Sequence, residues 1–268
     1  MRAGSGRRVR NRPARWRRYP FRMATIIETL KQCASIATEA MAETLWPTRC
    51  AVCDAPGQVL CDACRARLPY LDWWRACPRC GAPFGRVQCT ECNDAMLQLM
   101  GRARLPFASC ASATVYEGAP ARIVRTYKDR GERRLARELA YVMAASLPPA
   151  WRAERPALVA VPATGKALRA RGFDHMADVA AALSELTGLP LTQPLARPRS
   201  IDQRNLGRKE RFENMRGRFA VLPGATVPPR ILLVDDVLTT GATLMEAADA
   251  LLAGGAQQVR CITFARVW

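Results

Sequence analysis

The chain has 268 residues, of which 49% are hydrophobic, and its formal net charge is +18. This length suits one large domain or two smaller ones, and the hydrophobic fraction is too high for a disordered protein. No stretch approaches the ~18 consecutive apolar residues of a membrane-spanning helix, and no apolar core of signal-peptide length follows the basic N-terminus. We therefore predict a cytoplasmic protein without a membrane span.

The positive charge is unevenly distributed. Residues 1–22 contain nine arginines and no acid, which leaves +9 of the +18 for residues 23–268. Such an arm is typical of a disordered tail or a nucleic-acid contact. Alternatively, Met23 is the true start and the arm is not part of the working protein. The basic body suits a polyanionic partner, either nucleic acid or a phosphorylated small molecule.

Residues 23–46 are predicted to form an amphipathic helix. Thr25 and Glu28 have the spacing of a capping box, apolar residues then recur at helical spacing, and Pro47 ends the pattern. We expect the apolar face of this helix to pack on the protein rather than on a membrane.

Eight of the eleven cysteines lie within 43 residues and form four C-x-x-C pairs. The pairs are Cys50/Cys53, Cys61/Cys64, Cys77/Cys80 and Cys89/Cys92. Two such pairs supply the four thiolates of one closed, structural zinc site, so residues 47–93 are predicted to form a double zinc ribbon holding two zinc ions. Sequential pairing is the simplest assignment, although an interleaved one remains open. The other cysteines, at positions 33, 110 and 261, lie in apolar surroundings and are interpreted as buried residues without a metal.

From about residue 108 to the C-terminus, predicted strands alternate with predicted helices. Strands are expected at 112–116, 157–161, 230–234 and 259–265, and helices at 119–129, 133–146, 173–187 and 243–253; 201–216 is charged and expected to be partly helical. This alternation predicts an α/β domain with a parallel sheet covered by helices on both faces. Ligands of such sheets bind beyond the carboxyl ends of the strands, here in the loops after Val161 and Val234.

Residues 231–243, ILLVDDVLTTGAT, place two acids and a hydroxyl-rich turn after an apolar strand. Asp235 and Asp236 are suited to accept hydrogen bonds from a sugar diol or to lie near a divalent cation. The turn at 239–243 opens a helix, and its N–H groups and hydroxyls are suited to bind an anion. Together these features describe a site for ribose 5-phosphate. The alternative is a solvated turn with a helix N-cap.

The stretch resembles the phosphoribosyl pyrophosphate (PRPP) motif of type I phosphoribosyltransferases, which bind PRPP with Mg²⁺. In that family the two acids hold the ribose hydroxyls and the turn holds the 5′-phosphate. By this resemblance the binding residues are Asp235, Asp236, Thr239, Thr240, Gly241, Ala242 and Thr243.

With its cysteine pairs, the chain also resembles the ComF family over about residues 48–268. In that family a double zinc ribbon precedes a type I phosphoribosyltransferase domain, and members are associated with uptake of single-stranded DNA in natural competence. Further stretches that carry the resemblance are Tyr116-Glu117-Gly118, Lys128, 161–180 and 203–219.

The loop after Val161 contains Lys166, Arg169 and Arg171, which by the resemblance grip pyrophosphate; a solvated basic helix start is the alternative. This sequence departs from the family pattern R-G-F-N-Q-A, because it has Arg171-Gly172-Phe173-Asp174-His175-Met176. His175 is the only histidine of the chain, and we interpret it as a cap or surface residue rather than as a general base.

The basic segment 203–219 takes the place of the flexible lid of the enzymes, with Arg204, Arg208 and Arg211 as candidate residues. The same arginines are suited to follow a nucleic-acid backbone. Four aromatic residues accompany the ribbons and are expected to pack between ribbon and domain, with base stacking as the alternative: Tyr70, Trp73, Trp74 and Phe84.

Two functions follow from these patterns. The first is PRPP and Mg²⁺ binding in a competence protein that handles incoming single-stranded DNA together with other competence proteins. The second is an active phosphoribosyltransferase that transfers ribose 5-phosphate to an unidentified acceptor without a role in DNA uptake. The sequence assigns no catalytic residue for the second.

Overall fold

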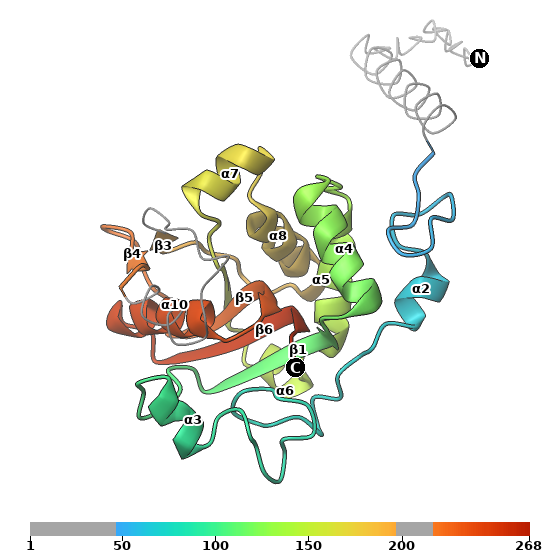
Figure 1. The fold of residues 1–268 in the computed structure, drawn as a ribbon. Helices are drawn as coiled ribbons and strands as arrows, with labels where there is room; N and C mark the ends of the chain where they lie inside the picture. The colour runs from blue at the N-terminus through green and yellow to red at the C-terminus, as the bar shows by residue number, and fades with distance from the viewer. Residues whose placement is uncertain (1–46, 197–216) are drawn as a thin grey trace, which may run out of the picture. The chain divides into compact units, whose positions relative to one another are not determined.

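The computed structural model describes residues 47–196 and 217–268 (Figure 1). The chain divides into two compact units, residues 1–48 and 49–268, and the fold described below is that of the second unit. Several sequence predictions lie outside the described residues. They are the arm 1–22, the helix 23–46, Cys33, the segment 201–216 and the candidate lid residues Arg204, Arg208 and Arg211.

A four-stranded parallel sheet forms the centre of the unit (Figure 1). Its strands, in spatial order, are β1 (Ser109–Val115), β6 (Gln258–Arg266), β5 (Arg230–Leu238) and β2 (Ala157–Ala160). All three strand pairs are parallel, and β5 lies between β6 and β2. The parallel sheet predicted from the alternation of strands and helices is therefore confirmed.

Helices cover both faces of this sheet. One face carries α4 (Gly118–Asp129), α5 (Leu135–Ser146) and α8 (His175–Thr187), and the other carries α10 (Ala242–Ala253). The side chains of β5 alternate between these two cores, as they must in an extended strand. Leu232 and Val234 join the core of the three helices, whereas Ile231 and Leu233 join that of α10. This two-sided burial explains why the strand reads as a continuous apolar run.

The strand β5 extends beyond its predicted end at residue 234. It continues to Leu238 because its pairing with β6 is maintained to that point, where Leu238 lies opposite Arg266. The other neighbour, β2, ends opposite Val234. Asp235 and Asp236 therefore lie within the strand rather than in a loop. At these two residues β5 is still paired with β6 but no longer with β2.

Several short elements were not predicted. They are α2 (Asp62–Ala66), α3 (Asp94–Leu99), α6 (Pro149–Ala153), α7 (Gly165–Arg171), and an antiparallel pair of β3 (Leu195–Ala196) with β4 (Ala220–Val221). Helices this short lack a repeating apolar pattern, so periodicity cannot reveal them. Across 47–196 and 217–268, no helix is long and apolar enough to cross a membrane.

Candidate functional site

The two adjacent acids of β5 are both buried, with Asp235 9% and Asp236 5% exposed. Asp235 accepts a hydrogen bond at Oδ1 from the backbone N–H of Asp236 (3.0 Å), and Asp236 Oδ1 accepts one from the N–H of Val237 (2.6 Å). A buried carboxylate needs a counter-charge, because desolvating an unpaired charge costs several kcal/mol.

Asp236 finds this counter-charge on neighbouring elements. Its Oδ2 forms an ion pair with Lys128 Nζ, at the end of α4, and accepts a hydrogen bond from His175 Nε2, at the start of α8 (3.1 Å). Burial alone raises the pKa of Asp236, but the Lys128 charge and the His175 hydrogen bond outweigh it and hold this pKa well below its ordinary value. Asp236 is therefore held as a carboxylate in the ligand-free protein.

The surface position expected for His175 is wrong, because the residue is only 6% exposed. The helix cap is instead Asp174, whose side chain accepts from the N–H groups of Met176 (3.1 Å) and Ala177 (3.2 Å). His175 Nδ1 lies 3.1 Å from Arg171 Nη1, and its carbonyl accepts from the buried Tyr127 hydroxyl (2.6 Å). Periodicity could not place it, because these contacts come from other segments of the chain.

The turn after β5 leads into α10 through Gly241, which adopts a φ of +81° that disfavours residues with a Cβ. Thr239 is exposed, whereas Thr240 and Thr243 are half-buried, and the Ala242 N–H points to Thr240 Oγ1 (3.4 Å). The turn thus gathers hydroxyls and the N-terminal N–H groups of a twelve-residue helix, where an anion is favoured.

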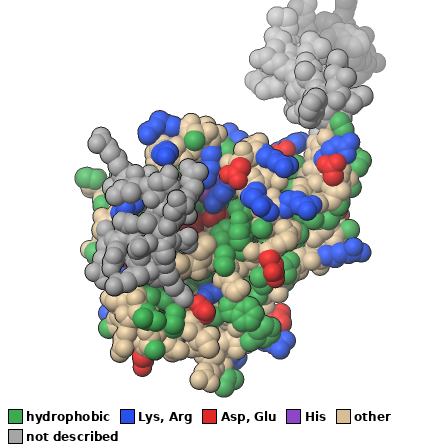
Figure 2. All heavy atoms as spheres, viewed as in Figure 1, with side chains coloured by type: hydrophobic (Ala, Val, Ile, Leu, Met, Phe, Trp, Pro, Cys, Tyr) green, Lys and Arg blue, Asp and Glu red, His purple; other side chains and the backbone are tan. Residues whose placement is uncertain are grey.

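The basic residues after β2 lie on α7 rather than in the predicted loop. Thr164 caps this helix by accepting from the N–H of Ala167 (3.1 Å). Lys166 and Arg169 are exposed, and Arg171 is linked to Asp236 through His175. Figure 2 shows basic side chains gathered on the upper part of the viewed face, where α7 and α4 lie.

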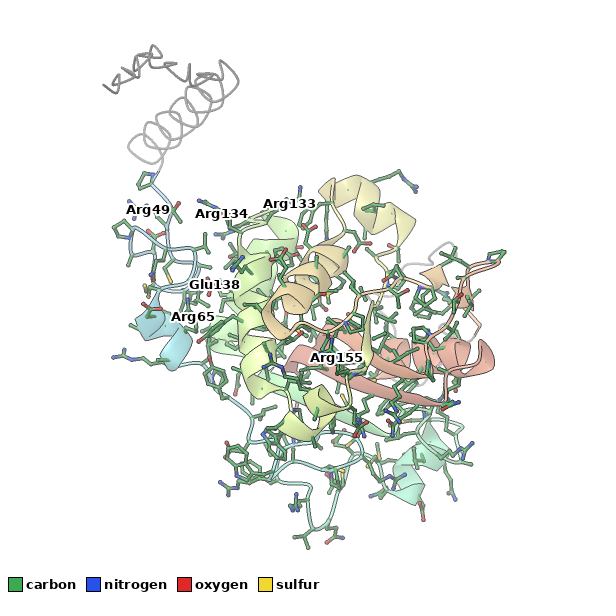
Figure 3. All side chains as sticks on the ribbon, turned by 180° about the vertical axis from the view of Figure 1, so that it is seen from behind. Arg49, Arg65, Arg133, Arg134, Glu138 and Arg155 are labelled. Carbon is green, nitrogen blue, oxygen red and sulfur yellow. The ribbon has the colours of Figure 1, made fainter. Side chains whose placement is uncertain are left out.

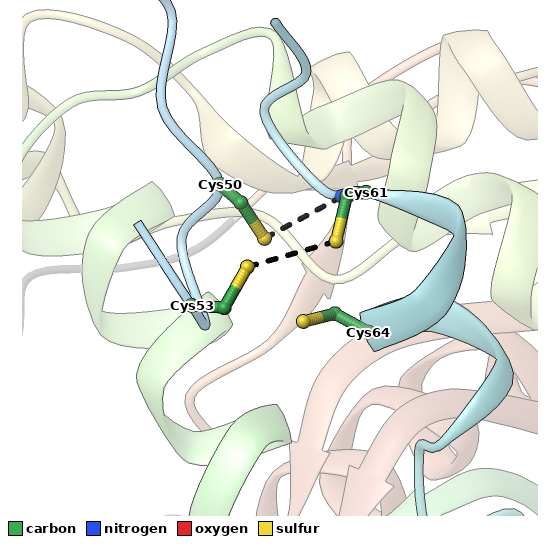
Figure 4. Close-up of side chains that lie close together, drawn as sticks. All are labelled: Cys50, Cys53, Cys61 and Cys64. Carbon is green, nitrogen blue, oxygen red and sulfur yellow. Dashed lines mark hydrogen bonds between the residues drawn. The ribbon is translucent and has the colours of Figure 1, made fainter. Parts of the chain in front are cut away.

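The first four cysteines of the repeat converge in one group (Figure 4). Their Sγ atoms all lie within 4.8 Å of one another, and those of Cys53 and Cys61 are 3.7 Å apart. A tetrahedral zinc ion with Zn–S bonds of ~2.3 Å separates its sulfurs by roughly 3.8 Å, so the spacing fits. Burial raises the pKa of Cys50, but hydrogen bonds from the N–H groups of Cys53, Cys61 and Val52 outweigh this effect. The net result is a pKa of about 6, which favours a thiolate.

The last four cysteines form a second, more buried group. Cys77 and Cys92 have Sγ atoms 3.6 Å apart, and those of Cys80 and Cys89 are 3.5 Å apart. The structure thus groups the cysteines sequentially rather than in the interleaved arrangement. The two tetrads suit two structural zinc sites, each with four sulfur ligands and no open position.

The two tetrads contact different parts of the α/β domain. Beside the first, Arg65 of α2 pairs with Glu138 of α5 at 2.8 Å, and Figure 3 shows these side chains pointing toward each other. Beside the second, a Cβ on Gly81 would lie 2.4 Å from the carbonyl oxygen of Cys110 on β1, so only glycine fits. Arg266 of β6 also donates to the carbonyl of Cys80 at 2.7 Å, in the buried interior.

The aromatic residues of the ribbon region do not pack between ribbon and domain as expected. Trp74 is 53% and Phe84 64% exposed, and Trp73 is also exposed. They belong to a surface group that we call the aromatic patch: Trp73, Trp74, Arg75, Phe84, Arg86 and Trp268. Within it the Phe84 and Trp268 rings are 5.8 Å apart, and the Arg75 guanidinium lies 5.2 Å from the centre of the Phe84 ring. Trp268 was missed because it is distant in sequence.

The fold and these sites define a phosphoribosyltransferase-fold protein carrying a double zinc ribbon. The family model described as "Phosphoribosyl transferase domain" matches residues 228–267, and "Double zinc ribbon domain" matches residues 41–97. Among curated proteins, competence protein ComFC of Bacillus subtilis (strain 168) is 25% identical over 203 residues, which cover 75% of this chain and 80% of the relative. These matches support a ComF-family protein.

Solved structures similar to this chain include two enzymes. Glutamine PRPP amidotransferase from B. subtilis, complexed with ADP and GMP, is 19% identical with a TM-score of 0.33, over 48% of this chain and 26% of the enzyme. Hypoxanthine phosphoribosyltransferase of Trypanosoma cruzi is 14% identical with a TM-score of 0.31, over 51% of this chain and 65% of the enzyme. The chain thus covers less than two thirds of either enzyme. With TM-scores this low, the fold assignment rests on the sheet topology and the family models.

Proposed function

We propose that this protein binds PRPP together with Mg²⁺ at the carboxyl end of β5. The observation that carries the proposal is the pair of buried acids directly before a helix-opening turn. Asp235 and Asp236 would accept hydrogen bonds from the ribose diol, and their carboxylates are the kind of ligand that Mg²⁺ prefers. Residues 239–243 would receive the 5′-phosphate at the N-terminus of α10.

Lys128 and Arg171 would complete this site electrostatically. Lys128 already pairs with Asp236, and Arg171 is linked to the same carboxylate through His175. Both cations are thus held close to the acids, and the charge of a guanidinium matches a phosphate. Lys166 and Arg169 would contribute weaker, solvent-screened attraction, because they are exposed.

Calorimetric titration of PRPP with Mg²⁺ tests this site. The Asp235→Asn/Asp236→Asn protein keeps the shape of both side chains but removes their charge, so we expect binding at least tenfold weaker, or about 1.4 kcal/mol. Glu185→Gln, which neutralises an exposed acid of α8, should bind like the wild type. Equal affinity of the double variant and the wild type would refute the proposed site.

We further propose that the protein acts in natural competence, in the cytoplasm, by handling single-stranded DNA. The observation that favours this function is the aromatic patch, because exposed rings with interleaved arginines suit base stacking and phosphate contact. The curated relative is named a competence protein, which agrees with this proposal. The net charge of +18 would add salt-dependent attraction to DNA.

Fluorescence anisotropy with a labelled oligothymidylate at several salt concentrations tests the DNA function. Trp74→Ala/Phe84→Ala should lose affinity by about tenfold or more, since a stacked base contributes ~1–3 kcal/mol. Tyr141→Ala is the matched control, because Tyr141 is an exposed aromatic residue of α5 outside the patch. DNA binding that is absent at low salt, or insensitive to the patch substitutions, would contradict the proposal.

The alternative function is phosphoribosyl transfer to an acceptor. In this case the same residues would hold PRPP while α7 and Arg171 stabilise the departing pyrophosphate, so that positioning and electrostatics supply the rate enhancement. A pyrophosphate-release assay with nucleobases, amines and single-stranded DNA as acceptors separates the two functions. Release that depends on an acceptor and on Asp236 would establish the transferase.

A further inference from the structure

Both ring nitrogens of His175 are engaged at the candidate site. Nε2 lies 3.1 Å from Asp236 Oδ2, and Nδ1 lies 3.1 Å from Nη1 of Arg171. The backbone of His175 is fixed as well, because the Tyr127 hydroxyl donates to the His175 carbonyl at 2.6 Å. The imidazole thus lies between the end of α7 and the carboxyl end of β5.

The partners of His175 determine its tautomer. The guanidinium of Arg171 is always a donor, so Nδ1 must offer its lone pair. The carboxylate of Asp236 is an acceptor, so Nε2 must carry the hydrogen. Only the neutral ring with hydrogen on Nε2 satisfies both contacts. An imidazolium ring would present an N–H toward Arg171 and place two positive charges at hydrogen-bond distance.

We propose that His175 is a positioning residue. It holds Arg171, the cation proposed to face the pyrophosphate, at a fixed position relative to Asp236, the carboxylate proposed to bind the ribose diol. This proposal rests on the proposed PRPP site and assigns a role to a residue whose side chain does not need to touch PRPP. A glutamine amide also offers a donor and an acceptor, so His175→Gln can keep both contacts although the residue type differs.

Calorimetry with PRPP and Mg²⁺ on two variants tests the role. His175→Phe keeps a ring but removes both hydrogen bonds, and we expect it to bind about tenfold more weakly. His175→Gln should bind within about threefold of the wild type, because it can restore both contacts. Thermal denaturation distinguishes a variant that is unfolded from a folded variant in which Arg171 is no longer held in place. Wild-type affinity in a folded His175→Phe protein would overturn the proposal.

Because His175 is the only histidine, nitrogen-15 NMR of the imidazole reports its tautomer directly in the PRPP-free protein. We expect a protonated Nε2 and an unprotonated Nδ1 at neutral pH. Hydrogen on Nδ1 would overturn the inference, whatever the PRPP result. If the tautomer is as expected but the wild type does not bind PRPP, the proposed function fails while the Arg171–His175–Asp236 contact stands.

Discussion

At the scale of single residues, the site depends on how one buried carboxylate is balanced. Asp236 is stabilised by Lys128 on α4 and by His175 on α8, which lie 108 and 61 positions away along the chain. If Lys128 is replaced by methionine, which is apolar and similar in length, Asp236 loses its main counter-charge. We expect Lys128→Met to lower the free energy of unfolding by about 3 kcal/mol.

Urea denaturation at pH 7 measures this loss. A double-mutant cycle with Asp236→Asn shows whether it comes from the pair, because the second substitution removes the charge that Lys128→Met leaves unpaired. The double variant should therefore be more stable than the sum of the single losses implies. Additive losses would contradict the assigned ion pair.

The same carboxylate makes stability depend on pH. The pKa of Asp236 is lower in the folded protein than its unfolded value of about 3.9, because Lys128 and His175 stabilise the charged form despite burial. This contribution is complete above the unfolded pKa and is lost as the pH falls through the folded one. Wild-type protein should therefore lose more stability than Asp236→Asn between pH 6 and pH 3, measured by urea denaturation.

The sequence revealed the acids but not their partners, for a physical reason. Asp235 and Asp236 stand between an apolar run and a threonine-rich turn. All three features lie within thirteen consecutive residues, so the sequence alone reveals the pattern. Lys128 and His175 reach them only through the packing of α4 and α8 on the sheet. Local periodicity carries no information about such contacts, and a lone histidine at a helix start is ordinarily exposed.

At the scale of elements, the candidate phosphate turn depends on a backbone conformation. Gly241 has a φ of +81°, and a Cβ at this position would lie 3.1 Å from Met245 Cε. Gly188, at the end of α8, has a φ of +69° with nothing near its missing Cβ. The two glycines thus share the conformational requirement, but only Gly241 lies in the candidate site.

Alanine at each of these positions separates stability from binding. Gly241→Ala and Gly188→Ala should each lower the free energy of unfolding by about 1 kcal/mol, because an L-residue is strained at positive φ. Only Gly241→Ala should also weaken PRPP binding, since it displaces the N–H groups at the start of α10. Thermal denaturation and calorimetry measure the two effects. Equal PRPP affinity in both variants would place the phosphate elsewhere.

At the scale of the whole molecule, the two zinc ribbons differ in which part of the α/β domain they join. The first tetrad has an exposed member, Cys53, but its buried Cys50 belongs to the core of α4, α5 and α8, beside the partly buried pair of Arg65 with Glu138. The second is mostly buried and shares a core with α10 and the sheet. A small cavity of about 20 Å³ lies between this tetrad and the candidate phosphate turn, lined by Cys80, Cys92 and Gly241 among others.

This asymmetry predicts different effects of removing each metal. Cys61→Ser/Cys64→Ser should abolish the first site while leaving PRPP binding nearly unchanged. Cys89→Ser/Cys92→Ser should abolish the second site, lower the melting temperature more than the first double variant does, and weaken PRPP binding. The reason is that the second tetrad packs against β1, β6 and the turn. Native mass spectrometry counts the zinc ions retained, and thermal denaturation and calorimetry report the rest. If both double variants lost one zinc ion and bound PRPP equally well, the second ribbon would be an appendage rather than part of the site.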